Sequence, residues 1–163
     1  MSPAGRVRHW PVMISLLVAM SLEVAPLPAD LAAWRPPWLA LVAIYWVLAY
    51  PRRYGLALAW STGLVLDVLK GGVLGQHALA MTVAVWVTLH FHLRLRVFPP
   101  WQQAMAVTGV VLAHEFLVFW VDGVSGDAVL GWQRLMPVVV AAIAWPVLAA
   151  LLDRLRFQLR MQT

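Results

Sequence analysis

Three carboxylates stand inside otherwise apolar stretches of the sequence: Glu23, Asp67 and Glu115. A charged side chain at the centre of a bilayer costs about 2.5–3.5 kcal/mol or more, so such residues usually face protein or water and find a partner. Histidines and cations elsewhere in the chain could serve as those partners. They are Arg35, Lys70, His77, His114 and Arg134.

Two interpretations of this set stay open. In one, the acids and cations form an intramembrane polar site, in the half of the membrane away from the cytoplasm, that binds a ligand or gates a partner. In the other, they form a buried ion-pair network that holds helix register, or they reach out to the lipid headgroups. Glu115 lies deepest and is least able to reach the headgroups, so it is the strongest candidate for a functional role.

Other kinds of chemistry find no support in the sequence. The chain has no cysteine, which excludes disulfides, thiolate metal sites and cysteine nucleophiles. His114 and Glu115 resemble half of a zinc-binding His-Glu-x-x-His motif, but position 118 is Val118. No phosphate-binding glycine loop, Ser-His-Asp set or catalytic carboxylate pair is present. We therefore expect no enzyme, and assign no catalytic residue, cofactor or metal ligand.

The composition indicates how these residues are positioned. Of 163 residues, 63% are hydrophobic and 12% are charged, whereas a soluble domain carries about 25% charged residues. We predict an all-α, polytopic membrane protein that forms one six-helix transmembrane domain over residues 1–163. The six apolar runs cover residues 10–27, 37–50, 56–69, 74–91, 101–121 and 135–152.

The second and third runs are short, at about 14 residues or roughly 21 Å, less than the ~30 Å hydrocarbon core. Three arrangements remain open for them. They gain length from the turn at Arg52 and Arg53, they are shielded by neighbouring helices, or they form a re-entrant hairpin. The first run resembles a signal peptide, but Pro26 directly after Ala25 argues against cleavage, so we expect an uncleaved first span.

Positive charge alternates between the two sides of the predicted spans. Nine arginines fall on the side of both termini, and only three cations fall on the other side, which predicts that both termini are cytoplasmic. The nine are Arg6, Arg8, Arg52, Arg53, Arg94, Arg96, Arg154, Arg156 and Arg160. Because these residues are dispersed at span ends, the net charge of +5 does not indicate nucleic-acid binding.

Two further surfaces are candidates for contacts. Arg52, Arg53, Arg94 and Arg96 form a candidate cytoplasmic basic face for anionic phospholipid or a filament partner, or they serve only as topology signals. Small residues would permit close approach of a partner helix. The candidate helix-packing surface consists of Ala57, Ser61, Gly63 and Ala80. The spacing of Gly71 and Gly75 also fits a helix-dimer motif, but its place at a span boundary favours a turn.

An ordered set of short motifs resembles the bacterial rod shape-determining MreD family. It includes Trp34-Arg35-Pro36-Pro37-Trp38, Tyr45-Trp46, Gly63-Leu64-Val65-Leu66-Asp67, Leu74-Gly75, Ala78-Leu79-Ala80-Met81, Trp101-Gln102-Gln103 and Trp145-Pro146. The chain length, the number of spans and the position of each motif agree with this family across nearly the whole chain. Asp67 stands at the family's Gly-x-x-x-Asp position.

The resemblance implies a non-enzymatic scaffold of the cell-elongation machinery in a Gram-negative inner membrane. The implied partner is MreC, through its transmembrane helix, with MreB, RodA and a class B penicillin-binding protein as further partners in the control of peptidoglycan synthesis. It also implies a fold like that of the substrate-binding subunits of energy-coupling-factor transporters. That likeness supplies the alternative function, a membrane-embedded subunit that binds a vitamin-like small molecule.

Overall fold

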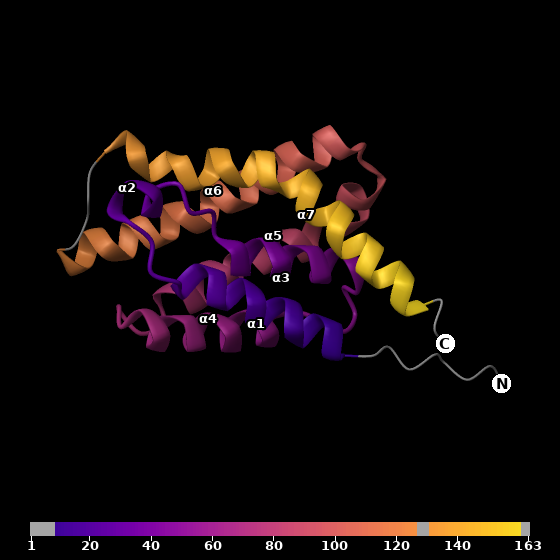
Figure 1. Ribbon diagram of the computed structural model, residues 1–163, viewed down its shortest axis with the longest axis horizontal. Helices are drawn as coiled ribbons and strands as arrows, with labels where there is room; N and C mark the ends of the chain where they lie inside the picture. The colour runs from indigo at the N-terminus through magenta and orange to yellow at the C-terminus, as the bar shows by residue number, and fades with distance from the viewer. Residues whose placement is uncertain (1–8, 127–130, 161–163) are drawn as a thin grey trace.

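The computed structural model describes residues 9–126 and 131–160, and within them every regular element is a helix (Figure 1). The helices are α1 (Trp10–Val24), α2 (Ala29–Ala32), α3 (Trp38–Ala49), α4 (Leu56–Lys70), α5 (Gln76–Val97), α6 (Pro100–Ser125), the 3₁₀ turn η1 (Trp132–Leu135) and α7 (Met136–Arg160). An all-α fold was predicted, and the structure confirms it.

Each of the six apolar runs corresponds to one helix, namely α1, α3, α4, α5, α6 or α7, but the helix ends differ from the predicted bounds. Helix α1 ends at Val24 rather than residue 27, since Pro26 and Pro28 follow and disfavour helix in the residues before them. Helix α5 continues to Val97, where Pro99 halts it. An apolar run ends where the side chains become polar, whereas a helix ends where its backbone is blocked. The short helix α2 was not predicted.

Three of the helical segments are long and apolar enough to cross a membrane: Gln76–Val97, Pro100–Ser125 and Trp132–Gln158. Helices α1 and α3 are apolar but shorter. Helix α4 has 15 residues and carries both Asp67 and Lys70. The structure therefore supports a membrane protein, and the number of complete passages stays a prediction.

Helix α3 lies at the centre of the bundle and packs against α1, α5, α6 and α7. Every side chain from Leu39 to Leu48 is buried. A helix that is apolar on all sides belongs in a core rather than at a polar surface. The short second run is thus enclosed by neighbouring helices. Helix α4 differs, because it buries one face against α5 and leaves Trp60, Val65 and Val68 exposed.

Both described ends of the chain lie at the same end of the bundle (Figure 1). His9 Nδ1 shares a hydrogen bond of 2.8 Å with the hydroxyl of Tyr54, and the hydroxyl of Tyr45 donates to Asp153 at 2.6 Å. We name this the inner end after the predicted orientation; it holds residues 50–55 and 97–100. The outer end holds residues 25–37, 70–76 and 122–126 with η1.

Candidate functional site

A polar cavity of about 510 Å³ opens at the outer end of the bundle. It is lined by residues from the end of α1 and the segment that follows, from the end of α4 to the start of α5, and from α6, η1 and the start of α7. The structure brings six of the seven residues of the predicted polar site to its lining: Glu23, Arg35, Lys70, His77, His114 and Glu115.

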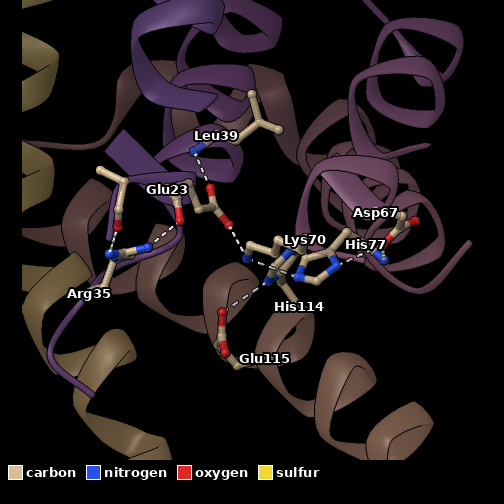
Figure 2. Close-up of polar contacts among 9 residues, drawn as sticks. Glu23, Arg35, Leu39, Asp67, Lys70, His77, His114 and Glu115 are labelled. Atoms are coloured by element: carbon tan, nitrogen blue, oxygen red, sulfur yellow. Dashed lines mark hydrogen bonds and ion pairs between the residues drawn. The ribbon is translucent and has the colours of Figure 1, made fainter. Parts of the chain in front are cut away.

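Glu23 lines the cavity and joins three helices through its contacts with Leu39 and Lys70 (Figure 2). Its side chain is only 5% exposed, and one carboxylate oxygen lies 3.0 Å from the ammonium nitrogen of Lys70 on α4. The other oxygen accepts a hydrogen bond of 3.0 Å from the backbone N–H of Leu39, in the first turn of α3. The positive end of the α3 dipole favours a carboxylate there.

Arg35 caps the C-terminal end of α1. Its guanidinium donates hydrogen bonds to the backbone carbonyls of Glu23 and Ala25, which lack helical partners. Basic side chains are favourable at helix C-termini for this reason. One donor is left over, because the Nε atom of Arg35 is buried and has no hydrogen-bond partner among the described residues.

Asp67 is the one member of the predicted polar site that does not line the cavity. It is 1% exposed, and its two oxygens accept hydrogen bonds from the backbone N–H groups of Gly75, His77 and Ala78, at 2.9, 2.9 and 3.3 Å. These are unpaired donors at the start of α5, so Asp67 caps that helix from α4. The cap thus occupies the carboxylate of Asp67 and separates it from the cavity that Glu115 lines.

His77 connects the cap to the cavity. Its Nδ1 lies 2.8 Å from Asp67 Oδ1, and its Nε2 lies 3.2 Å from the ammonium of Lys70. An ammonium group can only donate, so Nε2 accepts and Nδ1–H donates to the carboxylate. The result is a continuous polar chain through Glu23, Lys70, His77 and Asp67 that links α1, α4 and α5 (Figure 2).

His114 and Glu115 reach the cavity from α6. His114 is 2% exposed, and its ring lies 6.4 Å from the ring of His77, centroid to centroid. Its Nδ1 is 3.2 Å from a carboxylate oxygen of Glu115. Within the described part of the chain, no three His, Asp or Glu side chains are grouped to hold a metal ion.

Gln76, Asp122 and Arg134 also line the cavity. The sequence indicated Arg134 as a possible partner of the acids but assigned no role to Gln76 or Asp122. Arg134 forms an ion pair with Asp122 and lies over the ring of Phe119, 5.3 Å from its centroid. Gln76 donates to Asp122 and to the backbone carbonyl of Val118. Gln76 and Asp122 stand at the ends of predicted spans, where polar residues are common and carry no distinguishing signal.

The four residues of the candidate helix-packing surface do not share one face. Ala57 and Ser61 are exposed on α4, whereas Gly63 and Ala80 are buried. A Cβ atom on Gly63 would lie 2.4 Å from the Cα of Ala78, so this glycine lets α4 and α5 touch backbone to backbone. The predicted surface is thus corrected: close packing within the chain uses Gly63, which leaves it inaccessible to a partner helix.

The four arginines of the candidate basic face lie at the inner end. Arg52, Arg53 and Arg94 are exposed. Arg96 donates a hydrogen bond of 2.8 Å to the carbonyl of Ala49 and so caps α3. Arg6 and Arg8, which contributed to the predicted orientation, lie outside the described residues.

A second hollow differs in character from the polar cavity. It is an apolar groove of about 610 Å³ between α1 and α7, with Trp38 and Val42 of α3 at its base. Its walls carry mainly aliphatic side chains, and we call it the α1–α7 groove. Its lining includes Trp10, Pro11, Ile14, Ser15, Val18, Ala19, Leu22, Leu148, Leu151, Leu152, Leu155 and Gln158.

Comparison with known proteins places the chain in a family. The family model for the rod shape-determining protein MreD matches residues 5–155. The rod shape-determining protein MreD of Haemophilus influenzae is 30% identical over 156 residues, which cover 95% of this chain and 96% of the relative. No solved structure matches.

Proposed function

The chain belongs to the MreD family of rod shape-determining proteins, and from that premise we propose that it is a non-enzymatic inner-membrane scaffold that holds the transmembrane helix of MreC. The finer parts of this function are proposals too. They are the link to peptidoglycan synthesis, six complete passages through the membrane, and cytoplasmic termini.

The α1–α7 groove is the observation that carries the proposal. Lipid tails are as apolar as leucine, so one membrane helix gains little from burial against another unless the two shapes fit closely. The groove supplies such a shape, with exposed Ile14, Val18 and Leu151 along its walls. From residue 10 to residue 22 it follows α1 for about 18 Å. This length suits one apolar helix lying along the bundle.

The base of the groove also fits a helix. Ser15 and Ala19 are small and allow a neighbouring backbone to come close. The hydroxyl of Ser15 already accepts a hydrogen bond of 2.7 Å from the indole N–H of Trp46 and donates to the carbonyl of Val12. An apolar partner helix packed over Ser15 would therefore leave that hydroxyl with both of its hydrogen bonds. These features favour the α1–α7 groove over the predicted small-residue surface of Ala57, Ser61, Gly63 and Ala80.

Cysteine crosslinking tests the proposal directly, because the chain contains no cysteine of its own. Ile14→Cys, Val18→Cys and Leu151→Cys would each be paired with single cysteines along the MreC membrane helix in intact membranes. We expect disulfides at these positions and none from the matched exposed positions Val68→Cys on α4 and Met105→Cys on α6. Crosslinks from the control positions alone would place MreC elsewhere and refute the groove assignment.

Other partners would meet the chain at the inner end. The exposed side chains of Arg52, Arg53 and Arg94 provide a cationic surface. Such a surface suits anionic phospholipid, where each Lys or Arg contributes about 1 kcal/mol near a charged leaflet. It also suits the filament protein MreB. We extend the proposal to RodA and a class B penicillin-binding protein on the strength of family membership.

The alternative function is a membrane-embedded subunit that binds a vitamin-like small molecule. The polar cavity favours it, since about 510 Å³ lies within the ~300–1,000 Å³ typical of small-molecule sites. Mass spectrometry of the purified protein separates the two functions. A stoichiometric water-soluble vitamin would support the alternative, and co-purification of MreC without one would support the scaffold.

A further inference from the structure

The polar cavity at the outer end continues into an apolar groove on the flank of the bundle. This flank groove has a volume of about 240 Å³ and runs between α6 and the turn η1 that precedes α7. Glu115 and Arg134 line both hollows, so they form the junction between them. The rest of the flank groove is apolar and is lined by Leu112, Phe116, Phe119, Gly131 and Leu135.

The flank groove faces the surroundings of the bundle. Leu112, Phe116 and Leu135 are exposed, and both adjoining helical segments are long and apolar enough to cross a membrane. Lipid would therefore surround this opening. A polar cavity joined sideways to an apolar groove matches the outline of an amphiphile, with its head in the cavity and its chain along the groove.

The cavity retains donors suited to a phosphate group. The Nε atom of Arg35 is buried without a hydrogen-bond partner among the described residues. Lys70 has three N–H bonds, and its described partners, Glu23 and His77, use two of them. A buried donor without a partner is costly, and a bound anion can supply one. Guanidinium and ammonium groups are the side chains that most often hold phosphate.

The charge balance argues for a phosphate attached to a lipid rather than for free phosphate. Three cations and three carboxylates line the cavity: Arg35, Lys70, Arg134, Glu23, Glu115 and Asp122. Their formal charges cancel, so the cavity exerts little long-range attraction on a free anion. A lipid needs no such attraction, because the bilayer already holds its head at the cavity mouth at high local concentration.

We propose that the outer cavity binds the phosphate head of a membrane phospholipid, with one chain of that lipid lying in the flank groove between α6 and η1. None of the lining residues lines the α1–α7 groove. The lipid site and the MreC site are therefore separate, and either one can fail without the other.

The test measures lipid binding by the full-length protein in detergent, with native mass spectrometry and thermal unfolding as readouts. Three additives are compared: dioleoyl phosphatidylglycerol, the diacylglycerol with the same chains, and inorganic phosphate. We expect the phosphatidylglycerol to stay bound and to raise the melting temperature, and the other two to do neither.

Two variants locate the site. Gly131→Phe adds a side chain to the flank groove, at an extended backbone position (φ 171°) where a Cβ meets nothing within 4 Å. Arg35→Lys removes the spare Nε donor. We expect each variant to bind phosphatidylglycerol roughly tenfold more weakly or worse. Arg35→Lys loses about one charge-assisted contact, whereas Gly131→Phe occupies the space of the lipid chain.

The controls are matched to these variants. Arg96→Lys alters another arginine that caps a helix, at the inner end and away from the cavity. Val68→Phe adds an aromatic ring to an exposed position on α4. Wild-type affinity in both site variants would overturn the proposal, as would equal effects of diacylglycerol or of inorganic phosphate. If Arg35→Lys fails to fold, Gly131→Phe decides the outcome, because it leaves the cap of α1 intact.

Discussion

The carboxylate of Asp67 on α4 lies 2.8 Å from the Nδ1 atom of His77 on α5, and the same oxygen accepts the backbone N–H of His77 at 2.9 Å. Side chain and backbone of one residue thus converge on one carboxylate. Asp67 lies in the last turn of α4 and caps the start of α5, and His77 carries the link onward to Lys70 and the outer cavity.

Asp67→Asn is expected to destabilise the protein by about 2 kcal/mol or more, which combines the loss of a helix cap with poorly paired buried donors. The amide would replace one accepting oxygen with an NH₂ group that faces the N–H donors of α5. Thermal unfolding followed by circular dichroism measures the effect. Asp30→Asn, on an exposed residue of α2, is the control and should leave the melting temperature unchanged. Similar values for both variants would contradict the capping role.

Gly63→Ala is expected to destabilise the pairing of α4 with α5 by about 1–3 kcal/mol, the usual range for overpacking. The added methyl would overlap the backbone of Ala78, which has no room to move as a side chain would. Gly109→Ala in α6 is the matched control. A Cβ there meets nothing within 4 Å, so that variant should gain up to about 1 kcal/mol of helix propensity. A neutral Gly63→Ala would show that the helices are farther apart.

The ion pair of Lys70 with Glu23 gives an asymmetric prediction. Lys70→Gln should destabilise more than Glu23→Gln, because it leaves a carboxylate that is 5% exposed without its cation, whereas the Lys70 side chain is 31% exposed and can turn to water. A double-mutant cycle from melting curves should give a coupling of about 0.5–3 kcal/mol, as expected for residues in contact. Additive losses would mean that the two residues do not interact.

The orientation can be tested with single cysteines in a chain that has none. Gly72→Cys in the exposed α4–α5 turn should react with a membrane-impermeant maleimide added from the periplasm. Arg53→Cys in the exposed turn before α4 should react only in inverted vesicles. This pair also tests whether α4 crosses, since labelling of both positions from one side would show that α3 and α4 form a re-entrant hairpin.

Val18→Trp is expected to weaken the complex with MreC roughly tenfold or more, because a bulky side chain would fill the α1–α7 groove. Val68→Trp is the control, since Val68 is also exposed but lies on α4. Pull-down of tagged MreC in mild detergent gives the comparison. Equal recovery with both variants would remove the groove from the MreC interface.

Much of the fold follows from local patterns. The apolar runs and the proline and glycine breaks predicted helices that the structure contains, because these depend on a residue and its immediate neighbours. Helix ends were less predictable. Helix α5 passes through Arg94 and Arg96, which interrupt an apolar run but do not block a helical backbone.

The candidate site was predicted less completely. The cost of placing a charge in the membrane pointed to the acids and to the residues that could pair with them. The structure gathers five of these at one cavity: Glu23, Lys70, His77, His114 and Glu115. Gln76 and Asp122 were missed, because polar residues are common near the ends of spans. Their role becomes visible only in the contacts of Gln76 with Val118 and of Asp122 with Arg134. The separation of Asp67 from the cavity was also not visible, because an acid in an apolar run looks the same whether it binds a ligand or caps a helix.

By itself the sequence determined an all-helical membrane protein of the MreD family with acids that must find partners. Hydropathy and local backbone preferences act within a few residues, so a single chain displays them. Only the tertiary structure decided the partners: Asp67 with α5, Gly63 with Ala78, Glu115 with both a cavity and a flank groove, and α1 with α7 across an open groove. These contacts join residues far apart in the chain, and the geometry of packing selects among pairings that the sequence leaves equally possible.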